Sequence, residues 1–89
     1  MERNRREGKE GMKELIEYIA KSLASKPEDV KVTEEIEEGE EGRVILKLEV
    51  ADEDKGKIIG RQGRVAQAMR VLLRVAAVKN GTRAILEIV

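Results

Sequence analysis

The sequence of 89 residues contains neither cysteine nor histidine. Without cysteine, the chain can form neither a disulfide framework nor a thiolate site for a metal ion. Without histidine, it lacks the usual general base of enzymes and the commonest metal ligand. Its serine and threonine hydroxyls therefore have no imidazole to activate them as nucleophiles. We expect no catalytic residue, no metal, no cofactor and no small-molecule substrate.

Aromatic residues and long apolar runs are scarce as well. Tyr18 is the only aromatic side chain, whereas RRM and OB folds stack bases on several exposed rings. We expect Tyr18 to be a partly buried packing residue. Apolar runs reach only four residues, as at Val75–Val78. This pattern predicts no membrane span and no signal-peptide core, and hence a cytoplasmic protein.

Charge of one sign is missing from a long stretch of the chain, although the net charge is zero. Residues 12–54 carry six basic and fourteen acidic side chains, whereas residues 55–89 carry eight basic and one acidic. No acidic residue occurs from Lys55 to Arg83. One interpretation is a basic face for an anionic partner. The other is that the two halves neutralise each other within the fold or across a dimer.

The first half of the chain shows a helical and then an alternating apolar pattern. Residues 1–11 have no apolar period and are predicted to be a disordered polar extension ahead of one domain over residues 12–89. A helix is predicted from Met12 to about Ala24, followed by a β-hairpin. The residues expected to face the core are Met12, Leu15, Ile16, Ile19 and Leu23 in the helix, and Val30, Val32, Ile36, Val44, Leu46, Leu48 and Val50 in the hairpin.

The second half predicts two helices and a last strand. The stretch ADEDKGKIIG indicates a short helix with carboxylates in its first turn, where the helix dipole favours them, and with Gly60 in a left-handed terminal position. A long helix over about Arg64–Lys79, capped by Asn80-Gly81, precedes the strand TRAILEIV. A two-helix crossover gives parallel pairing of that strand. The predicted fold class is α+β, in the order α-β-β-α-α-β, with a three-stranded mixed sheet and the helices packed on one face.

The spacing Gly-x-x-Gly occurs three times, at Gly8–Gly11, Gly39–Gly42 and Gly60–Gly63. The first lies in the polar extension and is predicted to be flexible. The second lies in the hairpin turn, where glutamates would repel phosphate. The third, in KGKIIGRQGR, lies between two predicted helices and among basic residues. Its glycines would let the backbone approach a phosphate, near the outward-pointing N–H groups of the next helix.

The unit DKGKIIGRQGRVAQAMRVLL, in this element order, resembles the K-homology (KH) domain, and the preceding helix and hairpin resemble its type II, bacterial form. Over about residues 12–89, the chain is similar to the small single-KH proteins of bacteria, the KhpA group. The resemblance implies single-stranded RNA in a groove for about four nucleotides, clamped by Gly60–Gly63. It also implies an RNA regulator or chaperone linked to cell elongation and division. As partners it implies a second copy, in a homodimer, or a larger KH-R3H protein, in a heterodimer.

Residues around the clamp extend the predicted site. The flanking cations would attract RNA, and one of the adjacent Ile58 and Ile59, about 100° apart on a helix, would line the groove. The long helix carries a stripe of Arg64, Gln67, Arg70 and Arg74, interrupted by valines that predict self-association. The predicted RNA-binding residues are Lys55, Lys57, Ile58, Ile59, Gly60, Arg61, Gln62, Gly63 and Arg64, and the predicted dimer interface is Val71, Arg74 and Val78.

Two other functions stay open. The third Gly-x-x-Gly could be the turn of a helix-turn-helix DNA binder, although the preceding helix is short. Alternatively, the KH fold is kept as a protein-interaction module that has lost RNA binding. The hairpin loop beside the predicted groove is acidic, which would narrow the RNA accepted or weaken its binding; its glutamates are Glu37, Glu38, Glu40 and Glu41.

Overall fold

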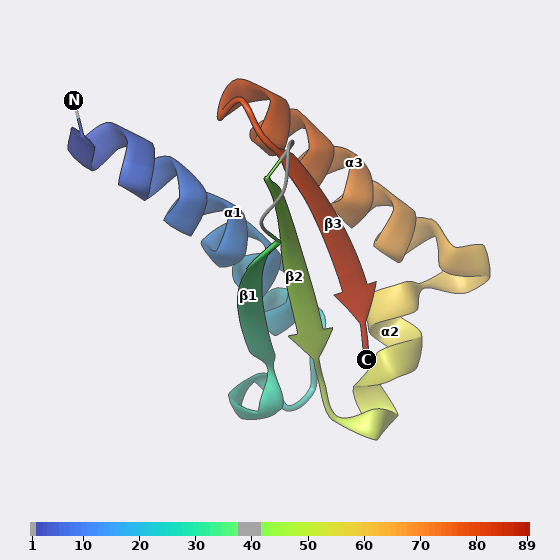
Figure 1. Cartoon of the computed structure of the whole chain (residues 1–89). Coiled ribbons are helices and arrows are strands. Elements are labelled where there is room, and N and C mark those ends of the chain that lie inside the picture. The colour runs from blue at the N-terminus through green and yellow to red at the C-terminus, as the bar shows by residue number, and fades with distance from the viewer. Residues whose placement is uncertain (1, 38–41) are drawn as a thin grey trace.

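A computed structural model describes the backbone of residues 2–37 and 42–89 and the side chains of residues 11–37 and 42–89. Figure 1 shows a short sheet with helices behind it. The elements, in chain order, are α1 (Glu2–Leu23), β1 (Lys31–Glu37), β2 (Arg43–Glu49), α2 (Lys55–Ile59), α3 (Arg64–Lys79) and β3 (Arg83–Ile88). Short 3-10 turns lie at Pro27–Asp29, Asp52–Asp54 and Arg61–Gly63. The predicted order α-β-β-α-α-β is confirmed.

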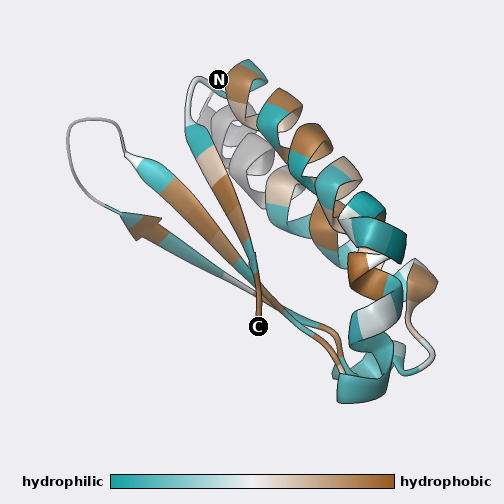
Figure 2. Ribbon diagram, turned by 90° about the vertical axis from the view of Figure 1, so that its right-hand side faces the viewer, coloured by the Kyte–Doolittle hydropathy of each residue, from teal (hydrophilic) through white to brown (hydrophobic). Residues whose placement is uncertain are grey.

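The sheet has the order β1-β2-β3, with β2 in the centre. Strand β1 pairs antiparallel with β2, placing Val32 opposite Leu48, and β3 pairs parallel with β2, placing Leu86 opposite Leu46. Seen from the side in Figure 2, the helices all lie on one face of the sheet, and no described element covers the other face. The predicted mixed sheet with one-sided helices is therefore confirmed, and β3 is an edge strand.

The core lies between the sheet and the helices. Buried residues recur every four positions along α1 and α3, and every two positions along β2, as an inward face requires. They include Met12, Ile16 and Ala20 of α1, Val44, Leu46 and Leu48 of β2, and Met69, Leu73 and Ala77 of α3. Helix α3 has the predicted bounds. It ends at Lys79 and is followed by a Schellman cap, in which Gly81 has a φ of 69° and the N–H of Thr82 donates to the carbonyl of Ala77.

Helix α1 begins ten residues before the predicted start, at Glu2 rather than Met12. The segment is rich in Glu, Arg and Lys and lacks proline, so it can extend a helix that the packed residues after it have nucleated. The first Gly-x-x-Gly, Gly8–Gly11, therefore continues a helix. The division of the chain at residue 11 stays a prediction. The second Gly-x-x-Gly, apart from Gly42, and the loop residues Glu38, Glu40 and Glu41 lie outside the described residues.

The prediction that Tyr18 is partly buried is wrong, because its side chain is 73% exposed. Tyr18 lies midway between the buried Ile16 and Ala20, about 200° around the helix from each. Leu23 and Ile36, which were expected to face the core, are also exposed. Leu23 is the last residue of α1, and Ile36 lies near the end of the edge strand β1.

Candidate functional site

The loop between α2 and α3 has an unusual backbone. Gly60 (φ 81°, ψ 169°), Gln62 (φ 57°, ψ 26°) and Gly63 (φ 75°, ψ 14°) all have positive φ. Gly60 was expected to be left-handed helical, but its extended ψ places it in a region that only glycine adopts readily. A Cβ at Gly60 would also lie 2.4 Å from Cγ2 of Val65 and 2.8 Å from the Val65 nitrogen. A side chain at this position would therefore strain the loop.

Two backbone N–H groups of the loop are left for a ligand. The N–H of Gly60 donates to the Gly56 carbonyl at 2.8 Å, and the N–H of Gly63 donates to the Gly60 carbonyl at 3.0 Å. Among the hydrogen bonds of residues 2–37 and 42–89, none uses the N–H of Arg61 or Gln62. These donors lie directly before the N-terminus of the 16-residue α3. Free N–H groups in such a turn favour an anion.

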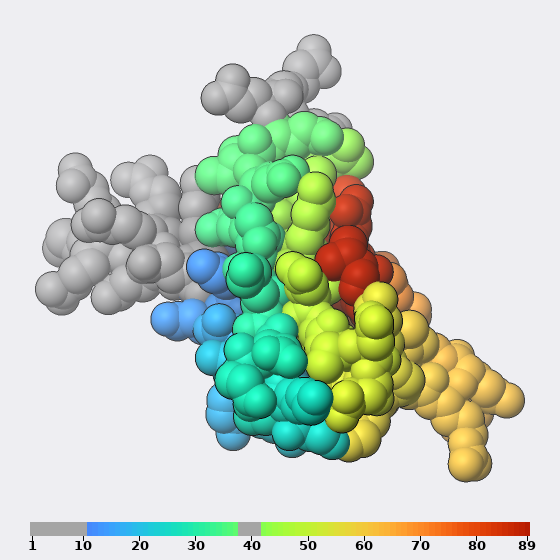
Figure 3. Space-filling view, turned by 90° about the horizontal axis from the view of Figure 1, so that it is seen from below, coloured from blue at the N-terminus to red at the C-terminus, as the bar shows by residue number. Residues whose placement is uncertain are grey.

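The cations around the loop fall into two groups. Lys55 Nζ lies 3.3 Å from Asp52 Oδ1. Lys57 donates to Ser25 Oγ, and its Nζ lies 3.9 Å from Asp54 Oδ1. Arg61 and Arg64, in contrast, have no carboxylate partner in the described part of the chain, and Arg64 donates to Gln62 Oε1 at 3.3 Å. The two arginines are therefore the cations beside the loop that are open to an anion. Figure 3 shows this part of the chain, in gold, protruding from the molecule.

The structure separates the two adjacent isoleucines that were predicted to flank the loop. Ile58 is fully buried in the core, whereas Ile59 is 41% exposed. The buried side chain fixes α2 to the body of the fold. Only Ile59 has surface left for a ligand.

A recess that the sequence did not reveal runs between α3 and the edge strand β3. A volume of about 190 Å³ adjoins a larger one of about 360 Å³, and both are bordered by Arg74, Ala84 and Ile85. The other bordering residues are Arg70, Leu73 and Leu86 in the smaller part, and Arg43, Ala77, Val78, Thr82 and Arg83 in the larger. The recess thus combines an apolar floor with arginines. The predicted parallel placement of β3 beside β2 is the signal that could have located it.

The residues predicted to form a dimer interface, Val71, Arg74 and Val78, lie within about 60° of one another around the axis of α3. Arg74 and Val78 both border the recess, and Val78 is 71% exposed. The interface itself stays a prediction. Two more exposed apolar side chains of α3, Leu72 and Val75, accompany the valines. The apolar surface of α3, defined as Val71, Leu72, Val75 and Val78, therefore includes the two valines of the arginine stripe and continues to one side of it.

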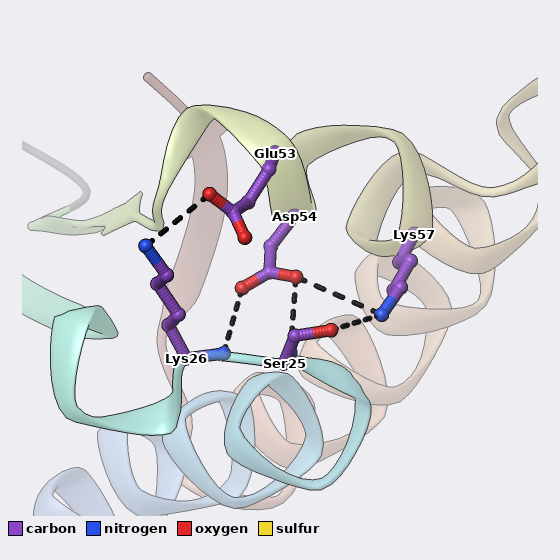
Figure 4. A network of polar contacts seen from close by, with 5 residues as sticks. All are labelled: Ser25, Lys26, Glu53, Asp54 and Lys57. Atoms are coloured by element: carbon purple, nitrogen blue, oxygen red, sulfur yellow. Dashed lines mark hydrogen bonds and ion pairs between the residues drawn. The ribbon is translucent and has the colours of Figure 1, made fainter.

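A buried carboxylate behind the loop was also missed. Asp54 was expected only to favour a helix dipole, but it is fully buried and accepts hydrogen bonds from the backbone N–H groups of Ser25 (2.9 Å) and Lys26 (3.0 Å). Figure 4 shows these contacts together with Lys57 and Glu53. The two N–H donors hold the pKa of Asp54 below its ordinary value, so the carboxylate is charged at neutral pH.

Two other kinds of site are absent from the described residues. No helix there is both long and apolar enough to cross a membrane. The described Asp and Glu side chains form no group of three or more placed to hold a metal ion.

Comparison with known proteins gives one consistent family. The chain matches the family described as KhpA/KhpB, KH domain, over residues 13–88. A protein named RNA-binding protein KhpA from Clostridium perfringens is 53% identical over 78 residues, which are 88% of this chain and 100% of that protein. Proteins of the same name from Clostridium acetobutylicum (88% of this chain and 100% of that protein) and Treponema pallidum (85% and 91%) are each 50% identical. No solved structure matches. The chain therefore belongs to the KhpA/KhpB KH-domain family.

Proposed function

We propose that this protein binds single-stranded RNA, with phosphates against Gly60–Gly63 and bases in the recess between α3 and β3. The observation that carries the proposal is the pair of N–H groups, of Arg61 and Gln62, that have no partner among the described residues. Beside them lie the side chains of Arg61 and Arg64, which have no carboxylate partner there either. The relatives named RNA-binding protein KhpA support the choice of RNA as the anion.

The recess suits the bases of such a strand. Arg70 lies six residues along α3 from Arg64, or about 9 Å at 1.5 Å per residue. A strand held at the loop therefore reaches the recess within a few nucleotides, in keeping with a footprint of about four. Ala84 and Ile85 offer apolar surface to a base, and arginine guanidinium groups stack on bases and pair with phosphates. Ile59 supplies the apolar wall nearest the loop.

The helix-turn-helix alternative is disfavoured by the geometry of α2. A helix-turn-helix crosses the DNA backbone with its first helix and inserts the N-terminal residues of its second helix into the major groove. Here the first helix has only five residues. The arginines Arg70 and Arg74 border the recess beside β3 rather than the N-terminal end of α3. A module that binds only proteins stays as the second candidate, favoured by the exposed apolar side chains of α3.

A fluorescence-polarisation titration with single-stranded RNA and duplex DNA of equal length tests the proposal. The RNA should bind more tightly, and log K should fall with log[salt] at a slope of roughly −2 to −3, because about three or four phosphates are engaged. Preference for the duplex would restore the helix-turn-helix alternative, and a slope near zero would exclude the phosphate clamp. Absence of binding to both would leave the protein-interaction module.

We further propose that the protein self-associates through the apolar surface of α3. Four large apolar side chains exposed along one helix are unusual on a monomer. Sedimentation should show a dimer that Val71→Glu converts to a folded monomer. Tyr18→Glu is the matched control, since it places the same charge at an exposed apolar residue of α1. A wild type that stays monomeric at high concentration would end the idea. A heterodimer with a larger KH-R3H protein, implied by the family resemblance, would use the same surface.

The cellular role that the resemblance implies is that of a cytoplasmic RNA regulator or chaperone linked to cell elongation and division. We carry it as part of the proposal. Crosslinking the protein to RNA in cells and sequencing the attached RNA tests it. Enrichment of transcripts for cell-wall and division proteins is expected, and an unselective RNA profile would contradict the link.

A further inference from the structure

Helix α2, which carries the loop, cannot hold its position unaided. It has five residues, far fewer than the roughly 12–15 below which an isolated helix is marginal in water. The loop after it, Gly60–Gly63, has a glycine at each end and three residues with positive φ. Its backbone therefore has little intrinsic preference for this one conformation. The direction in which the N–H groups of Arg61 and Gln62 point therefore depends on what anchors α2.

The structure gives α2 two anchors, one apolar and one ionic. The apolar anchor is Ile58, at the C-terminal end of α2, buried in the core. The ionic anchor is Asp54, directly before α2, whose two carboxylate oxygens accept from the N–H groups of Ser25 and Lys26 in the turn after α1. The contact joins residues 28 and 29 positions apart in the sequence. Hydrogen bonds from N–H groups to a buried carboxylate are directional and strong.

Neighbouring side chains add further polar contacts on both sides of Asp54 (Figure 4). Lys57 of α2 donates to Ser25 Oγ, and its Nζ lies 3.9 Å from Asp54. Lys26 Nζ lies 3.3 Å from Oε1 of Glu53. These polar contacts therefore join side chains of the turn after α1 to side chains of the segment that precedes and forms α2. Lys57, whose side chain is 53% exposed, is held by these two contacts, which makes it part of the anchor.

We infer that Asp54 is a positioning residue of the RNA site, which contacts no RNA and fixes the Gly60–Gly63 loop by tying α2 to the turn after α1. The inference rests on the proposed RNA binding at that loop. It predicts an effect opposite in sign to simple electrostatics. Removing a carboxylate near an RNA site should strengthen binding, whereas removing Asp54 should weaken it, because the loop loses its orientation.

Asp54→Asn and the control Asp52→Asn separate the two effects. Both variants remove one negative charge from the same turn, but Asp52 is exposed and contacts only Lys55 in the described residues. In Asp54→Asn, the new amide would offer one oxygen where two N–H groups need acceptors. Asp54→Asn should weaken RNA binding about tenfold, as when supporting groups of other sites are removed. Asp52→Asn should bind as tightly as wild type or more tightly. Binding by Asp54→Asn that equals or exceeds that of Asp52→Asn would overturn the inference.

A purely structural role is excluded by measuring affinity where circular dichroism shows each variant to be folded. An unfolded fraction of a few per cent changes the apparent dissociation constant by only that fraction. Amide hydrogen exchange gives a second readout: Gly60 and Gly63 should lose protection in Asp54→Asn, while the N–H groups of β2 keep theirs. Unchanged protection of the two glycines would also contradict the inference.

Hydrogen exchange also tests the inference if the variant does not fold or if the wild type binds no RNA. If Asp54→Asn does not fold, hydrogen exchange in the wild type tests whether Asp54 holds the loop. The N–H groups of Ser25 and Lys26 should open together with that of Gly60, with one common free energy. A Gly60 that opens far more readily than Ser25 and Lys26 would refute the coupling. Should the wild type bind no RNA, the proposed function fails, and the exchange measurements still test whether Asp54 holds the loop.

Discussion

Gly8–Gly11 and Gly60–Gly63 share the same spacing, and a basic residue follows the first glycine in both, yet they form different structures. The first continues the helix α1, and the second is a loop in which Gly60, Gln62 and Gly63 have positive φ. The difference comes from what surrounds each segment. The first precedes Met12, the first buried residue of α1 in the described side chains. The second is held between the buried Ile58 and the tightly packed contact of Gly60 with Val65.

The same difference decides whether either segment can bind an anion. Inside a helix, each N–H donates to the carbonyl four residues earlier, so the backbone of Gly8–Gly11 has no donor to offer. In Gly60–Gly63, the N–H groups of the two central residues are left without partners among the described residues. The spacing of the glycines alone therefore does not predict an anion-binding site. The backbone conformation of the segment does.

Replacing one glycine of each segment with alanine should give effects of opposite sign. Gly60→Ala should lower the free energy of unfolding by about 3 kcal/mol, because the added Cβ meets Val65 and the backbone conformation suits only glycine. Gly11→Ala should raise it by about 0.5–1 kcal/mol, because Gly11 is helical with nothing within 4 Å of an added Cβ. Urea denaturation measures both. Unchanged stability of Gly60→Ala would show that the loop conformation of Gly60 is not required.

Reversing the charge between the glycines should separate the two segments in RNA binding. Arg61→Asp with Gln62→Asp should weaken binding about a hundredfold or more, because carboxylates would lie where phosphates are bound and like charges in contact cost several kcal/mol. Both side chains are exposed, and Asp tolerates the positive φ of position 62, so the fold should persist. Fluorescence polarisation and circular dichroism measure the two expectations.

Lys9→Asp with Glu10→Asp is the matched control for this change, since it alters the same two positions of the helical Gly-x-x-Gly. It should leave RNA binding nearly unchanged. If both double variants bind like wild type, Gly60–Gly63 is only a turn. If both lose binding equally, the basic residues ahead of Met12 are the RNA contact, and the loop assignment is wrong.

Much of the fold could be predicted because it depends on local patterns. The apolar periods of α3, β2 and the hairpin are strong, and the helical crossover leaves β3 one favoured pairing. The site could be predicted less fully, because its residues are held in place by contacts between residues far apart in the sequence. No local pattern shows that Asp54 meets Ser25, or which of two adjacent isoleucines is buried. The exposure of Tyr18 likewise depends on which face of α1 the sheet covers. The recess required knowing that β3 lies at an edge beside α3.

Replacing the third residue of each Gly-x-x-Gly segment, Glu10 or Gln62, with glycine should give the smallest difference in the free energy of unfolding. Gln62 is the one non-glycine residue with positive φ in the described backbone, a conformation that costs a side chain roughly 1–2 kcal/mol. Gln62→Gly removes this strain but gives the unfolded chain more freedom, so the free energy of unfolding should rise by only about 0.5 kcal/mol. Glu10→Gly should lower it by about 0.5–1 kcal/mol, because position 10 is helical. Urea denaturation of both variants, compared at equal m values, measures the sign of each change in the free energy of unfolding. A loss of stability in both variants would mean that Gln62 carries no strain, and that the loop is held in this shape by Gly60, Gly63 and the anchors of α2 alone.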